Sequence, residues 1–203
     1  ASESSEATAN CYHGIGHGAF HFYGSKATLS GTALTAQSLE ECAKISDTPL
    51  ELDYCAGGVF ADAFIHSQMN DYGLSFNKKD PFALCREQSE QYKWICYYSA
   101  KPVLLTLGDG DFPKAASFVN DINEDAYAVA VIESLATSVT MRNIENAVSI
   151  VDYAKDISVC RGLQERLRLP CMQGLAIELL THSSAHDALQ FCNLSVLVAQ
   201  ERD

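Results

Sequence analysis

Apolar positions recur along the chain at the intervals of a helix that buries one face. From Thr32 to Cys42 the apolar residues fall on one helical side, and a longer run of the same kind begins at Asp125. The segment from Ser46 to Pro49 interrupts the pattern and places a proline in the first turn of the next element. Alternating runs rich in β-branched residues, which are typical of strands, do not appear in the sequence. The pattern therefore predicts an all-α fold.

The same helical pattern begins at each of four cysteines. Three residues after each cysteine comes a small residue, and an apolar stripe follows at the same offsets in every copy. The small residues after Cys11, Cys55, Cys96 and Cys171 are Gly14, Gly58, Ser99 and Gly174. The interval from Cys96 to Cys171 is close to twice the length of one copy, which indicates one further copy without cysteines. We interpret the shared positions as a common framework.

We therefore predict tandem helix pairs that form a single domain over 1–203. Such pairs cannot bury their apolar faces alone, so they stack into an α-solenoid or a closed helical bundle. The arrangement resembles tetratricopeptide and HEAT repeats in plan, although it lacks their signature residues. The five expected pairs span 11–42, 55–85, 96–122, 124–160 and 171–200.

Eight cysteines, an even number, predict disulfides that brace these helices. Three loops are each bracketed by two cysteines, so the simplest connectivity is Cys42–Cys55, Cys85–Cys96 and Cys160–Cys171. Closing a loop of this length adds about 3 kcal/mol of stability in the chain-entropy account. Cys11 and Cys192 are then left over, and they can pair only if the ends of the array meet. The alternative joins the two ends of each hairpin, as in Cys11–Cys42 and Cys55–Cys85, and spacing alone does not choose between the two.

The charge of the chain limits its partners. With 26 acidic and 14 basic residues the formal net charge is −12. This balance argues against nucleic acid, because phosphate binding needs clustered lysine and arginine. A basic protein or peptide, or a metal ion, suits such a surface better. No apolar run approaches the about 20 residues that cross a bilayer.

Two features favour an oxidising compartment. Cysteines in even number and at loop-closing intervals are typical of secreted and periplasmic proteins. The chain also opens on a small, polar stretch from Ala1 to Ala7, as chains do once a signal peptide has been removed. We therefore expect a secreted or periplasmic protein.

The densest group of reactive side chains lies between Cys11 and His21, where half of the six histidines occur. In a helix, His13, His17 and His21 stand at i, i+4 and i+8 and share one face. Neutral imidazole is the commonest transition-metal ligand, so these histidines are candidate ligands. A carboxylate from another copy would complete the shell, and the best placed are Asp62 and Glu178. This donor set suits a divalent transition metal such as Zn, Cu or Fe.

Three glycines, Gly14, Gly16 and Gly18, lie between these histidines. Gly16 and Gly18 have no counterparts in the other copies, and a glycine in a helix interior costs up to about 1 kcal/mol relative to alanine. We therefore expect a packed helix or a ligand to approach this backbone closely. Gly14 does recur, and we attribute it to close helix packing at a shared position.

The remaining histidines form a second candidate metal or polar site. His66 and His182 occupy the same offset in their copies, and His186 follows His182 at i+4. The alternative for all six histidines is a hydrogen-bonded surface or core residue without a ligand.

Three functions stay open, in order of preference. The first is an extracytoplasmic protein that binds a transition metal through the histidine cluster. The second is a helical-repeat module for a protein or peptide partner, which is basic if charge steers the encounter. The third is a metal-dependent enzyme that uses the same cluster with an open coordination position. No nucleophile or nucleotide-binding motif names a reaction, so no catalytic residue is assigned.

Overall fold

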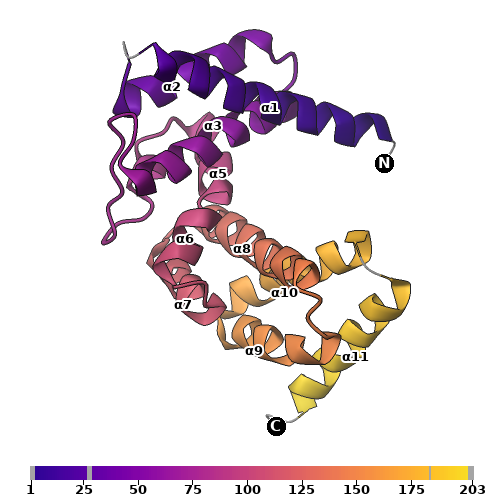
Figure 1. Cartoon of the computed structure of the whole chain (residues 1–203). Helices are drawn as coiled ribbons and strands as arrows, with labels where there is room; N and C mark the ends of the chain where they lie inside the picture. The colour runs from indigo at the N-terminus through magenta and orange to yellow at the C-terminus, as the bar shows by residue number, and fades with distance from the viewer. Residues whose placement is uncertain (1–2, 27–28, 183, 201–203) are drawn as a thin grey trace. The chain divides into compact units, whose positions relative to one another are not determined.

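The computed structural model describes residues 3–26, 29–182 and 184–200, and within these ranges every regular element is a helix (Figure 1). This result confirms the all-α prediction. The chain divides into two compact units, Ala1–Val103 and Leu104–Asp203, which are described one after the other. The five-pair repeat over 1–203 stays a prediction. No helix within the described ranges has the length and apolar character needed to cross a membrane.

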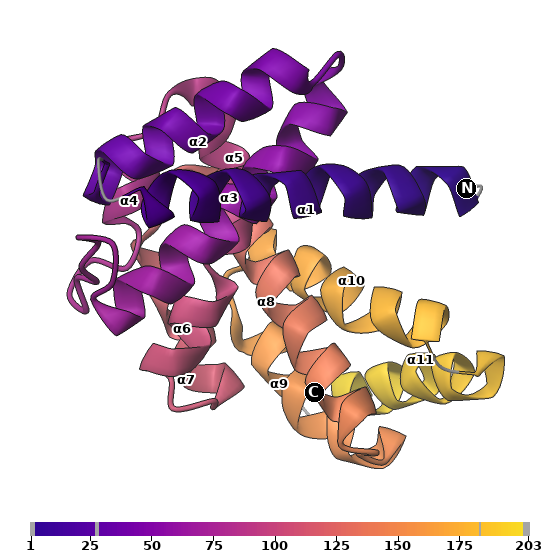
Figure 2. The same ribbon diagram turned by 45° about the horizontal axis from the view of Figure 1, so that its top comes forward.

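The first unit is built around a central helix, α3. Its elements are α1 (Glu3–Ser25), α2 (Gly31–Ile45), α3 (Pro49–Met69), α4 (Ala83–Arg86) and α5 (Glu90–Ser99). Helices α1, α2 and α5 all pack on α3, and Figure 2 shows α1 lying across it. The core between these helices contains Phe20, Leu34 and Phe60, none of which has any exposed surface.

Two glycines allow the backbones of α1 and α3 to touch. A Cβ on Gly16 would overlap the carbonyl oxygen of Cys55, and a Cβ on Gly58 would overlap that of His13. The approach predicted at Gly16 is therefore real, and the approaching group is a helix. Gly14 and Gly18 have open space where a Cβ would lie. The packing role expected for Gly14 and the close approach expected at Gly18 are therefore wrong, because among the described residues no group lies near either glycine.

The sequence sets both ends of α3. Thr48 accepts a hydrogen bond from the backbone of Glu51, whose carboxylate bonds back to Thr48 N, and Pro49 occupies the first turn. At the other end, Asn70 adopts a left-handed conformation with φ of 54°. Asp71 N then donates to the His66 carbonyl over 2.9 Å, so the following loop stays close to the last turn of α3.

Three disulfides close the three loops that the cysteine spacing brackets. They are Cys42–Cys55, Cys85–Cys96 and Cys160–Cys171. This connectivity is the simpler of the two expected, and the hairpin alternative is wrong because each cysteine lies beside its loop partner. Cys11 and Cys192 carry free, exposed thiols.

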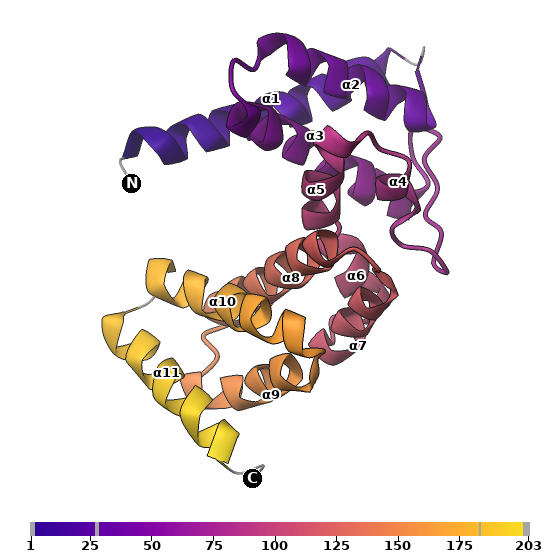
Figure 3. The ribbon, with the colours of Figure 1, turned by 180° about the vertical axis from the view of Figure 1, so that it is seen from behind.

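The second unit begins within α6, the helix that contains the boundary between the two units. Its elements are α6 (Lys101–Leu107), α7 (Phe112–Ser117), η1 (Phe118–Asp121), α8 (Asp125–Glu145), η2 (Ile150–Tyr153), α9 (Ala154–Gly162), α10 (Glu165–His182) and α11 (Ala185–Gln200). Helix α10 packs along α8, as Figure 3 shows from behind. Gly174 permits this contact because a Cβ there would crowd the Glu133 carbonyl oxygen, and Thr140 Oγ1 donates to the Leu175 carbonyl over 3.1 Å.

Within the pair expected over 124–160, a turn separates the two helices. Helix α8 ends at Glu145, and Ala147 then takes a positive φ of 51° while Val148 N donates back to the Asn143 carbonyl. These bonds close the end of α8. Helical structure resumes only at η2, and α9 follows it.

Candidate metal centre

Asp62 is a buried carboxylate on the face of α3 that meets α1. Only 6% of its surface is exposed. Its Oδ2 lies 2.9 Å from His17 Nδ1 and 3.3 Å from His21 Nε2. Despite these short distances, the described residues give this oxygen no donor in hydrogen-bonding geometry. A buried carboxylate oxygen without a hydrogen bond is costly, so a bound cation would relieve the cost.

Two histidines converge on this carboxylate from different helices. His21 on α1, and Asp62 and His66 on α3, each offer one ligand atom, and the three atoms lie within 4.8 Å of one another. With metal–ligand bonds of about 2.1 Å, two ligands of a tetrahedral ion lie about 3.4 Å apart. The 3.3 Å between His21 Nε2 and Asp62 Oδ2 already fits that value. The geometry of these three residues could hold a metal ion.

The ring of His66 is held by its neighbours. Its Nδ1 lies 3.2 Å from Asp71 Oδ2 in hydrogen-bonding geometry. The ring stacks on Phe20 with centroids 5.7 Å apart, and the Tyr72 ring packs edge-on at 4.7 Å. Asp71 and Tyr72 both come from the loop that follows α3. Because Nδ1 bonds to Asp71, the nitrogen left for a metal ion is Nε2.

His13 and His17 continue the row of imidazoles along α1. Their Nε2 atoms lie 3.2 Å apart, and the two rings meet edge to face with centroids 4.7 Å apart. Desolvation of its ring, followed by the neighbouring His17, lowers the pKa of His13. His13 therefore stays neutral, and able to bind a metal, to a lower pH than an isolated histidine.

The structure brings most of the predicted first site together but changes its membership. Asp62 contacts both His17 and His21, as expected for the carboxylate of this cluster. His66, which we assigned to a second site, belongs to the group of three converging ligand atoms. His13 contacts His17 and stands outside that group.

The other predicted ligands lie in the second unit and form separate contacts. Glu178 Oε2 lies 3.2 Å from His182 Nε2, one turn away on α10. His186 Nε2 lies 2.9 Å from the Gln190 side chain. The predicted face of His182 and His186 is wrong, because α10 ends at His182 and His186 belongs to α11. The offset that His182 shares with His66 does not give the two histidines the same surroundings.

Asp71 was missed at the sequence level, although one signal for it existed. Asp71 follows His66 by five residues, just after the point where Asn70 ends the helix. Asn and Gly around an acidic residue are typical of a turn, and this turn folds the carboxylate back onto the histidine. The return contact depends on three positive φ angles, at Asn70, Tyr72 and Gly73.

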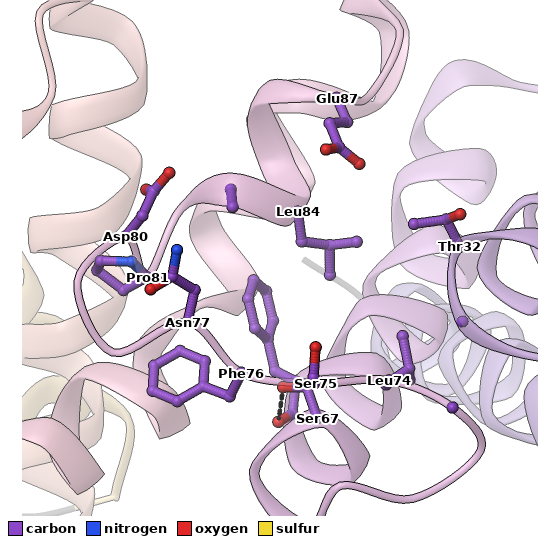
Figure 4. A pocket seen from close by; sticks show the side chains of 14 residues that line it. Thr32, Ser67, Leu74, Ser75, Phe76, Asn77, Asp80, Pro81, Leu84 and Glu87 are labelled. Atoms are coloured by element: carbon purple, nitrogen blue, oxygen red, sulfur yellow. Dashed lines mark hydrogen bonds between the residues drawn. The ribbon is translucent and has the colours of Figure 1, made fainter.

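A separate pocket of about 270 Å³ lies between α3 and the loop that follows it (Figure 4). Phe64 and Ser67 of α3 line it, together with the loop side chains Leu74 and Phe76. None of the described residues that line it is a histidine, and of its two carboxylates, Asp80 and Glu87, the first pairs with Arg86. We therefore treat this pocket as distinct from the histidine cluster.

Comparison with protein-family models, with curated proteins and with solved structures finds no match for this chain.

Proposed function

We propose that this protein binds a divalent transition metal ion through His21, Asp62 and His66. The observation that carries the proposal is the buried Asp62 Oδ2, which lacks a hydrogen-bond donor among the described residues and lies close to two imidazoles. A divalent ion would replace the missing donor and hold the three side chains together. Asp71 would keep the His66 ring in the orientation that binding requires.

The donor set narrows the choice of metal. Two imidazoles with one carboxylate are known ligands of Zn²⁺ and of non-haem Fe²⁺. Ca²⁺ and Mg²⁺ prefer oxygen ligands in larger number, so they suit the site poorly. A centre with three protein ligands keeps a coordination position for water or a small molecule.

We also propose that the protein works outside the cytoplasm. Three disulfides close its loops, and such bonds persist in oxidising compartments. Zn²⁺ is the simpler choice there, because it has no redox chemistry in an oxidising environment.

The test is metal binding by protein purified without a histidine tag, stripped with a chelator, and alkylated at Cys11 and Cys192 so that free thiols take up no metal. Zn²⁺ affinity is measured by competition with a chromophoric chelator, and Co²⁺ absorption reports the coordination geometry. We expect tight binding by the wild type, and a loss of at least about tenfold in affinity for Asp62→Asn and His66→Gln.

The matched control is His186→Gln, which removes an exposed histidine of the second unit and should leave affinity unchanged. Circular dichroism establishes that each variant is folded. The proposal is wrong if the wild type takes up no Zn²⁺ or Co²⁺, or if folded Asp62→Asn and His66→Gln both bind as tightly as the wild type.

A further inference from the structure

The imidazoles of His13 and His17 lie beside the proposed centre but outside it. Their Nε2 atoms lie 3.2 Å apart on successive turns of α1. Two nitrogens bound at about 2.05 Å to one ion are 3.2 Å apart when the angle at the metal is about 100°. This angle lies between the tetrahedral and square-planar values. The pair therefore has the spacing of two ligands of a single ion.

Each ring is held on its other side by α3. A Cβ on Gly57 would lie 3.5 Å from His13 Nδ1, and the His13 ring lies beside the backbone of Tyr54. His17 Nδ1 lies 2.9 Å from the buried Asp62 Oδ2. That carboxylate lies on the Nδ1 side of the ring, so Nε2 is the His17 nitrogen turned toward His13. The two Nε2 atoms are in hydrogen-bonding geometry with each other, and an ion bound between them would displace the shared proton.

The glycines of α3 keep this pair in place. A Cβ on Gly58 would overlap the His13 carbonyl oxygen, so any larger residue would push α1 away from α3. Moving α1 outward would separate His17 from Asp62 at the same time. The contact that builds the inner centre thus also positions the outer pair.

We propose that His13 and His17 form a second, outer metal subsite, with Asp62 linking it to the inner centre. The outer subsite takes a borderline divalent ion that favours imidazole, such as Cu²⁺ or Zn²⁺. Asp62 is a ligand at the inner centre and orients His17 at the outer one. Only two protein ligands serve the outer ion, and the His17 side chain is 35% exposed, so water completes its shell and it binds more weakly. This inference rests on the proposed function, since it shares Asp62 with the inner centre.

The test counts Cu²⁺ ions per chain by native mass spectrometry, again with both free thiols alkylated, and follows nitrogen couplings by electron paramagnetic resonance. We expect two ions on the wild type. His13→Gln should retain one ion and lose the weaker binding step, and His66→Gln should also retain one ion. His186→Gln is the control and should retain two.

Asp62→Asn distinguishes a linked subsite from any exposed histidine pair. This variant keeps His13 and His17, yet we expect the outer ion to bind about tenfold more weakly because His17 loses its orienting charge. An unchanged outer affinity in a folded Asp62→Asn protein would overturn the link.

The two proposals fail in different ways. If the wild type binds one ion and His13→Gln binds it equally well, there is no outer subsite, and the inner centre is unaffected. If His66→Gln binds as many ions as the wild type while His13→Gln binds none, the inner centre fails and the outer pair stands alone.

Discussion

At the scale of single residues, the candidate centre depends on a carboxylate oxygen that is buried and has no hydrogen-bond donor among the described residues. The Asp62 side chain is almost fully buried, and its Oδ2 lies beside two imidazoles. His66 is one turn away on the same helix, and Asp71 fixes its ring from behind. Asp62 Oδ2 is therefore an acceptor without a donor among the described residues, as expected of a site that a cation completes.

Asp71→Asn tests the role of the orienting carboxylate. We expect the affinity of the inner centre for Zn²⁺ to fall about 10-fold to 100-fold, which is the usual effect of losing a group that orients a metal ligand. The stability of the metal-free protein should change little, because Asp71 is exposed. Chelator competition measures the affinity, and Asp47→Asn, another exposed acidic residue of the first unit, is the control. Equal affinity in the Asp71 variant and the wild type would contradict the role.

Asp156 in the second unit gives a prediction about pH. Burial raises the pKa of its carboxyl above the ordinary value of 3.8, although a hydrogen bond from Asn143 partly opposes the shift. The folded state therefore holds this proton more tightly than the unfolded chain. Stability is favoured below pH 3.8 and lost as the pH rises from there through the folded pKa.

Asp156→Asn removes this titration and keeps a polar group beside Asn143. We expect the variant to gain stability relative to the wild type as the pH rises from about 4 to 6. Urea unfolding across that range measures the difference. A constant difference at all of these pH values would show that Asp156 has an ordinary pKa in the folded protein.

Within each helix, residue spacing shows which side chains share a face, but the partners across helices could not be predicted from the sequence. His17 and His21 stand four residues apart, as do Asp62 and His66, so each pair lies on one helical face. Grouping His66 with His182 was an error, because a common offset from a cysteine does not specify the neighbouring loop. His66 has the Asp71 loop beside it, whereas His182 ends its helix.

At the scale of elements, the crossing of α1 and α3 positions every group of the candidate centre. Gly16 and Gly58 remove the side chains that would keep the two backbones apart. Short side chains such as Asp62 can then reach the facing helix. The crossing therefore explains why glycine occurs in helix interiors, where it lowers intrinsic helix stability.

Glycine variants separate the effect of glycine on helix stability from its effect on the crossing of α1 and α3. Gly58→Ala should destabilise the protein by about 1–3 kcal/mol, as overpacking does, and should weaken metal binding because α1 moves away from Asp62. Gly18→Ala has open space for its methyl group, so it should stabilise α1 by up to about 1 kcal/mol and leave metal affinity unchanged. Urea unfolding and chelator competition give the two quantities. Similar losses in both variants would mean that the crossing does not set the site.

Helix positions were largely predictable because their signals are local. The break at Ser46 to Pro49 and the helix that begins at Asp125 both appear where the sequence places them. The first helix starts at Glu3, earlier than the pair expected from position 11, because the small polar residues before Cys11 continue the same helix. Which glycine meets another helix was not predictable, since Gly14 and Gly16 differ only in the direction that each faces.

At the scale of the whole molecule, all residues of the proposed inner and outer sites belong to the first unit. Two of the three disulfides also lie there. Cys42–Cys55 ties α2 to α3, and the Cys55 carbonyl oxygen is the atom that Gly16 packs against. This disulfide therefore fixes α3 at the point where α1 crosses it.

Removing one disulfide from each unit tests whether metal binding depends on the first unit alone. Each double alanine variant, of Cys42 with Cys55 or of Cys160 with Cys171, should lose about 3 kcal/mol of stability, because the loops that they close are similar in length. Only the first variant should also bind Zn²⁺ more weakly, since it loosens α3 at the α1 crossing. Saturating Zn²⁺ at about 100 times the dissociation constant should add about 2.7 kcal/mol to the folded state of the variant that lacks Cys160–Cys171. Calorimetry and chelator competition measure both effects, and equal losses of Zn²⁺ affinity in the two variants would contradict a site confined to the first unit.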